Sequence, residues 1–320
     1  MRVWPLLLFL LVLLISVGCT SNRGLTETLK FRSGLVDTTA LNDESVSTPP
    51  LAIARSRLES WSPELCVPEV SDPTALAILS GISSRVPALG DPSGWNVRFG
   101  RELNATDDRP HFVNRTRRHD KVLPIVEGKL LSPFRVDVDA AAFGIPVKTA
   151  TTLMDSDAFR RSRIGYRDVA SATNKLTLIA AMLPPGCVST HTVFVSKTLL
   201  DDESLWCLLA LLNSLVANYL VRLRVTTHVT TATMARLPVP KPVAGSPEFE
   251  TLALLSRRLS AKGVEAGVDD YAEINAVIAR LYGLTSDQFS YVLNTFPLIS
   301  TAVRDNCLRL FDGPVLPRLQ

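Results

Sequence analysis

The sequence lacks the residue patterns of a disulfide framework and of a metal site. Its 320 residues include five cysteines and four histidines, scattered singly, with no Cys-x-x-Cys pair. An odd number of widely spaced cysteines is typical of buried thiols in a reducing compartment. No cluster of cysteines and histidines has the spacing of zinc ligands. We therefore expect no metal site and no small domain stapled by disulfides.

The sequence also lacks a strong net charge. The formal charge is +3, with 46% apolar and 20% charged residues, which favours a packed core over general disorder. The length leaves room for about two domains. A small net charge does not establish binding to nucleic acid, because the position of the charge matters more than its sum. Basic residues do concentrate locally: between residues 109 and 135 seven of them face two acidic ones, and a second basic group spans 160–175.

The apolar N-terminus has two interpretations. Residues 1–18 carry one arginine and a mostly apolar run, and Cys19 follows, as in a bacterial lipoprotein signal. However, Ser16 stands where the lipobox normally has a branched aliphatic residue. The same run is typical of a strand buried on both faces, and residues 26–35 alternate like a half-buried strand. The N-terminal residues alone favour the signal.

Helical periodicity is clearest in the second half of the chain. Residues 203–223 predict one long apolar helix, and their polar residues argue against a membrane span. Residues 72–86 predict an amphipathic helix capped by Asp72 or Ser71 with Pro73 in its first turn. A short helix is expected over 51–61, and three more over 248–262, 269–283 and 284–297.

These helices are separated by short, strand-like apolar pieces. They run through residues 122–138 and 176–183, beside the two basic groups. Prolines at 238, 240 and 242 end the long helix region, and a new helical unit begins near residue 247. The pattern predicts an α+β fold: a strand-rich domain with a long core helix, followed by a small C-terminal helical unit.

Five segments in a fixed order carry a resemblance to a known family. They are FGRELNATDDRPHF (99–112), LPIVEGKLLSPF (123–134), RIGYRDVASATNKLTLIAAMLPPG (163–186), LLALLNSLVANYLVRLRVTTHVTTATMARLPVPKP (208–242) and IARLYGLTSDQFSYVLNTFPLI (278–299). Together they resemble the C-terminal target-recognition region of adenine-specific DNA methyltransferases of the type IIG restriction–modification kind, with its TaqI-like specificity domain. Each segment is a weak signal alone, and five in order are a strong one.

The chain departs from the family pattern at three positions. Leu176 stands where an arginine is expected, Thr226 where a glycine is usual, and Leu130 where a histidine is common. The loss of the arginine puts one expected phosphate or base contact in doubt.

The family's catalytic motifs are missing from this sequence. The resemblance implies a glycine-rich F-x-G-x-G loop for S-adenosylmethionine and an Asn-Pro-Pro-Tyr motif that binds a flipped adenine. The only similar run, Ser47-Thr48-Pro49-Pro50, lacks both the asparagine and the aromatic residue. We therefore expect no catalytic residue and no cofactor in this chain, which should not methylate DNA alone.

The resemblance assigns the parts of the chain. Residues 1–45 would be a remnant of the methyltransferase sheet (or a signal-like segment), 46–242 the target-recognition domain, 247–300 the C-terminal helical unit and 301–320 a tail. Since a DNA-binding protein has no use for export, we prefer the strand interpretation of the N-terminus. This implies the cytoplasm, with double-stranded DNA as partner, a separate catalytic chain as a further one, and no membrane.

The resemblance and the charge distribution together predict ten DNA-contacting residues. Each has a structural alternative: a solvated strand face, a basic loop, an ion pair of an arginine with Asp168 or Glu127, a polar turn, or a structural hydrogen bond. The ten are Arg117, Arg118, Lys129, Arg135, Arg163, Arg167, Asn174, Lys175, Thr227 and His228.

Two other functions compete with DNA recognition. The chain could be a folded but non-functional remnant of a split gene. It could also be an exported lipoprotein with a substrate-binding role, attached to the membrane through Cys19.

Overall fold

The computed structural model describes residues 15–19, 27–35, 51–61, 68–70, 72–115, 121–154, 157–170, 174–225 and 227–314. Helices and several antiparallel or mixed sheets occur together, which confirms the expected α+β class. The chain divides into two compact units, Met1–Ala77 and Ile78–Gln320. This division falls inside helix α2 (Pro73–Ser83), and the boundaries expected at residues 46, 242 and 247 stay predictions.

The first unit contains a three-stranded antiparallel sheet in the order β1-β2-β3, made of β1 (Ile15–Cys19), β2 (Thr28–Leu35) and β3 (Leu51–Ala54). The strand expected over 26–35 is confirmed as β2. The helix expected over 51–61 begins only at Arg55, as α1 (Arg55–Trp61). The preceding residues alternate in burial around Ile53, which is the period of a strand. Residues 1–14 of the apolar run lie outside the described part.

Helix α2 confirms the expected capping. The Asp72 carboxylate accepts a hydrogen bond from the backbone N–H of Ala75 at 3.0 Å, as a helix cap does. Pro73 occupies the first turn, where its missing N–H costs nothing.

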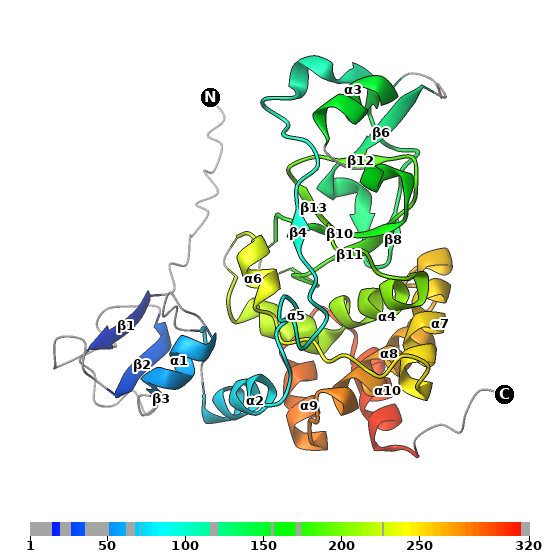
Figure 1. The fold of residues 1–320 in the computed structure, drawn as a ribbon. Helices are drawn as coiled ribbons and strands as arrows, with labels where there is room; N and C mark the ends of the chain where they lie inside the picture. Colours follow the sequence, from blue (N-terminus) through cyan, green and yellow to red (C-terminus); the bar gives the residue numbers. More distant parts are fainter. Residues whose placement is uncertain are drawn as a thin grey trace, which may run out of the picture. The chain divides into compact units, whose positions relative to one another are not determined.

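The strand-rich part of the second unit holds two four-stranded sheets (Figure 1). One is antiparallel, in the order β11-β10-β13-β4, with β4 (Phe99–Gly100), β10 (Arg163–Arg167), β11 (Ala180–Leu183) and β13 (Val193–Ser196). The other is mixed, in the order β12-β6-β9-β5, with β5 (Val113–Asn114), β6 (Val122–Val126), β9 (Phe143–Pro146) and β12 (Val188–Ser189). Short α3 (Val147–Leu153) and the ribbon of β7 (Leu131–Ser132) with β8 (Arg135–Val136) complete this part.

Strand β10 is central to the packing of this part. All but the last of its residues are buried, and its neighbours on either side are the apolar strands β11 and β13. A side chain at Gly165 would place its Cβ 2.5 Å from a methyl carbon of Leu183 and 3.1 Å from one of Val193. Any larger residue would force the Leu183 side chain to move, because the side chains of both neighbouring strands close over this position.

The single helix expected over 203–223 is wrong: two helices are present, α4 (Asp202–Leu212) and α5 (Leu215–Arg222), bent by 58°. The reason is local. The Ser214 hydroxyl caps α5 by accepting the N–H of Ala217 at 3.1 Å. The Asn213 side chain exchanges two hydrogen bonds, of 3.1 and 3.0 Å, with the backbone of Ala180 in β11. In the described part, no single helix is long and apolar enough to cross a membrane, and only this bent pair passes by length and composition.

The remaining helices are α6 (Thr231–Ala235), α7 (Pro247–Lys262), α8 (Val268–Leu281), α9 (Ser286–Asn294) and α10 (Thr301–Asp312). The three helices expected between 248 and 297 are confirmed, and Thr285 with Gln288 forms a capping box at the start of α9. Residues 301–312, expected to belong to a tail, form α10. In Figure 1 the sheet of β10 lies between the mixed sheet and the layer of helices, with α4 against β10 and β11.

Candidate functional site

Three of the five segments that carry the family resemblance, and the loop that follows one of them, meet at one end of the β10 sheet. We name this place the junction and define it by residues 127–129, 167–170, 190–192 and 227–229. Thr192 is its centre: its hydroxyl accepts the N–H of Gly128 at 2.9 Å, and its carbonyl accepts the N–H of Asp168 at 3.0 Å. Two more backbone bonds, Val229 N–H to Asp168 O at 2.9 Å and Ala170 N–H to Thr227 O at 3.0 Å, attach the last segment.

The glycine of the Glu-Gly-Lys segment lies close against Thr192. A Cβ at Gly128 would lie 3.1 Å from the carbonyl oxygen of Thr192, so a larger residue here would push the two loops apart by a few tenths of an ångström. The next residue, Lys129, has a side chain that is 66% exposed and pairs with Glu127 at 2.9 Å. Exposed pairs of this kind contribute little stability, and the ammonium group can exchange partners.

His228 and Asp168 form the second feature of the junction. The His228 Nδ1 lies 3.3 Å from an Asp168 carboxylate oxygen, and about half of the imidazole is exposed. Val169 forms an antiparallel bridge with His228. Val169 is itself 54% exposed, so this bridge presents an apolar and an aromatic polar side chain to solvent.

Arg167 is the cation of the junction that its surroundings leave unpaired. Among the described residues, its guanidinium takes part in no hydrogen bond or ion pair, and its Nε is buried without a partner. An unsatisfied buried donor costs free energy. An incoming acceptor at this position would therefore remove an existing penalty.

Arg101 is a second such cation, which the sequence reasoning missed. Its guanidinium lies 5.1 Å from the centre of the Phe194 ring, which stacks on Tyr166. Burial and the charge of Asp168 raise the pKa of Tyr166, and Arg101 acts in the opposite direction. Arg101 is exposed and has no acidic partner in the described part of the chain. The one sign of this role in the sequence is that Arg101 lies in the first resembling segment, immediately before Glu102.

Arg163 does not have the role predicted from the sequence. It is 1% exposed, and its Nε and Nη2 donate to the two carboxylate oxygens of Glu102 at 2.7 and 2.8 Å. Nη2 also donates to the carbonyl of Cys187 at 2.9 Å. Burial alone would lower the pKa of Arg163, but the Glu102 carboxylate outweighs it, so the pKa is raised. The alternative prediction that Arg163 forms an ion pair is confirmed, but the partner is Glu102 and not Asp168 or Glu127.

Asn174 and Lys175 form an exposed turn whose backbone carbonyls are bound by Arg222. The Nη2 of Arg222 donates to the carbonyls of both residues, and its Nε donates to the Thr177 hydroxyl at 3.0 Å. The same guanidinium lies 4.1 Å from the centre of the Phe296 ring, and burial lowers its pKa to about 10. The neighbouring Leu176, which replaces the expected arginine, is buried. The structure thus gives these residues a turn role, and base contacts from them stay a prediction.

The junction gathers only part of the predicted set. Lys129, Arg167, Thr227 and His228 belong to it. Arg135 lies on β8, with its guanidinium near Gly263 at the end of α7. Arg117 and Arg118 lie outside the described residues.

The described residues offer little for metal or thiol chemistry. They contain no group of three or more His, Cys, Asp or Glu that could hold a metal ion. Burial raises the pKa of Cys187 to about 11, and that of Cys207 and Cys307 to about 12. Thiols in such surroundings are poor nucleophiles.

Comparison with known proteins gives likenesses to solved structures and to nothing else that was compared. No family model matches the chain, and no curated protein matches it. The chain is similar to the type IIL restriction–modification enzyme MmeI, solved in complex with DNA, with 11% sequence identity and a TM-score of 0.44. The match covers 79% of this chain and 40% of that enzyme's chain.

Proposed function

We propose that this chain is the DNA-target-recognition part of an adenine-specific DNA methyltransferase in a restriction–modification system, of the type IIG kind and without the methyl-transferring half. The observation that supports this best is the junction. Segments spread over about a hundred residues converge there through backbone and hydroxyl hydrogen bonds. Arg167 and Arg101 stand in or beside it without acidic partners in the described part.

The junction has the chemistry that duplex DNA requires. Lysine and arginine contacts to phosphate provide affinity and register, and side chains on loops contact the base edges. Arg167 would donate to a phosphate or to the edge of a guanine, Lys129 would exchange Glu127 for a phosphate, and Thr227 and His228 would add polar contacts.

The interior of the sheet supports this surface. The Glu102 carboxylate fixes Arg163 and also accepts the N–H of Ser189 at 2.7 Å, one residue before the junction. Asn213 fastens the backbone of Ala180 in β11 to the break between α4 and α5. Rigid support of this kind keeps recognising side chains within the narrow tolerance that binding requires.

The complete system would need a catalytic half from a second chain. That half would hold S-adenosylmethionine and the flipped adenine, and the module proposed here would place the target adenine in it. We expect the protein in the cytoplasm. Lipid covalently attached to Cys19 in a membrane fraction would contradict that expectation.

A gel-shift titration on random duplex DNA tests the proposal. The full chain should shift DNA at about 50 mM salt, where even non-specific binders hold on, and release it steeply as salt rises. The Arg101→Ala/Arg167→Ala variant should bind at least about tenfold more weakly. Arg258→Ala, which removes one exposed arginine of α7, is the control for each single substitution and should bind like the wild type.

No shift of the folded wild-type chain at low salt would defeat the proposal. It would favour the alternative of a folded remnant without function. An equal loss of binding in the Arg258→Ala control would show that the effect comes from overall charge and not from the junction.

A further inference from the structure

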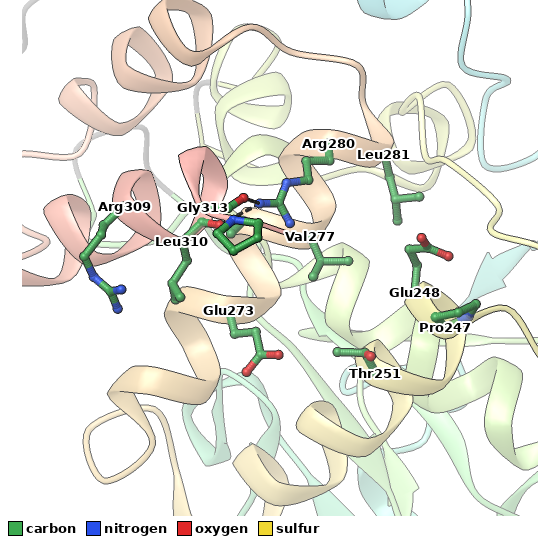
Figure 2. Close-up of a pocket in the computed structure, with 12 residues that line it drawn as sticks. Pro247, Glu248, Thr251, Glu273, Val277, Arg280, Leu281, Arg309, Leu310 and Gly313 are labelled. Carbon is green, nitrogen blue, oxygen red and sulfur yellow. Dashed lines mark hydrogen bonds between the residues drawn. The ribbon is translucent and has the colours of Figure 1, made fainter. Parts of the chain in front are cut away.

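A trough in the C-terminal helices is unrelated to the junction and has no occupant within the described residues. It has a volume of about 510 Å³ and lies over α8, between the start of α7 and the end of α10 (Figure 2). Its floor is a stripe of α8 formed by Glu273, Ala276, Val277, Arg280 and Leu281. These positions follow the spacing of one helix face. Helices normally bury such a face against another element.

The shape and lining of the trough suit a helix. The stripe is about 12 Å long, from the eight helical rises between Glu273 and Leu281, and Leu310 of α10 faces it from one wall. Val277, Leu281 and Leu310 are each only partly buried, so apolar surface remains to be covered. Ala276 on the floor is small enough to allow close approach of a second helix backbone. An added helix would lie along α8 with α7 and α10 on its two sides.

The charges in the trough select a basic occupant. In the described part of the chain, Glu248 and Glu273 take part in no hydrogen bond or ion pair. Burial, together with the charge of Asp270, raises the pKa of Glu273, and the positive charge of Arg258 opposes this rise only in part.

The two arginines of the trough are already engaged. Arg280 donates to the carbonyls of Leu310, Phe311 and Gly313 at 2.7, 2.7 and 3.0 Å. Its positive charge is therefore stabilised by the carbonyl dipoles at the C-terminal end of α10. Arg309 donates to Asn306 at 2.7 Å and lies at the edge of the group of side chains in Figure 2. The trough therefore combines apolar side chains with two carboxylates that form no hydrogen bond or ion pair among the described residues, while its arginines are bonded elsewhere.

We propose that this trough binds an amphipathic helix of a partner protein. Its apolar side chains pack on Val277, Leu281 and Leu310, and its lysines or arginines pair with Glu248 and Glu273. The inference does not rest on the proposed DNA function, because it uses other residues and another face of the second unit.

A designed peptide probes the trough in the full chain. The probe is a fluorescein-labelled, amidated helix of about 14 residues with leucines on one face and lysines beside them. The comparison peptide carries glutamate in place of each lysine. Fluorescence anisotropy should show the lysine peptide binding at least about tenfold more tightly than the glutamate peptide. The Glu248→Gln/Glu273→Gln variant should lose most of this preference.

A blocking variant locates the binding. Val277→Arg should weaken the lysine peptide at least about tenfold, because it fills the floor of the trough with a cation. Val243→Arg, at a highly exposed position outside the trough, is the matched control and should bind normally. Circular dichroism and thermal melting of both variants verify that they fold.

Three results would overturn the proposal. The first is equal binding of both peptides by the wild type, and the second is undiminished binding by a folded Val277→Arg variant. The third is binding that occurs only after deletion of residues 315–320, which would identify the chain's own segment as the occupant.

Discussion

The two ends of strand β10 carry arginines four residues apart that lie in opposite environments. Arg163 is buried, and both nitrogens of its fork that face Glu102 are bonded to that carboxylate. Arg167, about 13 Å further along the strand, has no acidic partner among the described residues and keeps a buried Nε without an acceptor. The same side chain on the same face of the same strand thus closes the core at one end and remains available at the other.

The difference shows what turns a basic residue into a candidate contact. Glu102 comes from the loop after β4 and reaches the Arg163 end, while the carboxylate nearest the other end, Asp168, lies close to His228. An arginine whose charge and donors are already satisfied gains nothing from a new anion. An arginine that is incompletely satisfied gains both a Coulomb interaction and a hydrogen bond.

The largest effect is expected at the Arg163 end. Arg163→Ala should lower the free energy of unfolding by about 3 to 5 kcal/mol, because it leaves the buried Glu102 carboxylate without its cation. The measurement is urea denaturation followed by circular dichroism.

A double variant gives the control. Arg163→Met/Glu102→Leu should recover part of that loss, since no buried charge remains unpaired. A loss below about 1 kcal/mol in Arg163→Ala would mean that the pair is not buried in solution.

A second effect at this end depends on pH. Cys187, whose carbonyl accepts from Arg163, has a pKa raised by burial from an ordinary value of 9.0 to about 11. The folded state therefore binds this proton more tightly than the unfolded chain. The resulting stability is fully present below pH 9 and is lost as pH rises through 11, by about 2 to 3 kcal/mol.

The Cys187→Ala variant isolates this contribution. Urea denaturation at pH 8 and near pH 11 should show a smaller decline in the variant than in the wild type. Identical declines in the two proteins would contradict the assignment to this thiol.

The opposite end of β10 should respond in binding and not in stability. Arg167→Ala is expected to reduce affinity for duplex DNA by about tenfold, or 1.4 kcal/mol. Its free energy of unfolding should change by no more than about 0.5 kcal/mol, because no partner within the described residues is lost. Gel-shift titration and urea denaturation of the same preparation measure both quantities. A large loss of stability would move Arg167 to the structural class of Arg163.

Much of the fold follows from local sequence patterns. The capped helices α2 and α9 and the strand β2 are visible as hydrophobic periods with turn or cap residues at their ends. The bend between α4 and α5 is not, because apolar periodicity continues across Asn213 and Ser214. The break depends on what those side chains bond to: the backbone of Ala180 far away in sequence and the N–H of Ala217.

The candidate site was predictable only in part, for the same reason. The basic segments could be found by composition, and the Glu-Gly-Lys and Thr-His segments by resemblance. Whether an arginine is already ion-paired depends on a carboxylate from another segment, as Glu102 shows for Arg163. Sequence spacing favoured nearer partners such as Asp168. Arg101 was overlooked because its support, the Phe194 ring, is contributed by a distant strand.

The smallest effect is expected for Lys129, which tests whether the DNA contacts extend from Arg167 to the Glu-Gly-Lys segment. Its exposed ammonium group is held by Glu127 at 2.9 Å, so Lys129→Ala should change the free energy of unfolding by less than about 0.5 kcal/mol. If Lys129 exchanges Glu127 for a phosphate, DNA affinity should fall only about two- to fivefold, because the new contact replaces an existing one. The slope of log affinity against log salt should become shallower by about 0.9.

Glu127→Gln is the informative partner variant: it frees the lysine and should raise affinity slightly. An unchanged salt slope in Lys129→Ala would exclude the phosphate contact. The DNA contacts at this end of the sheet would then be limited to Arg167 and the residues around the Val169–His228 bridge.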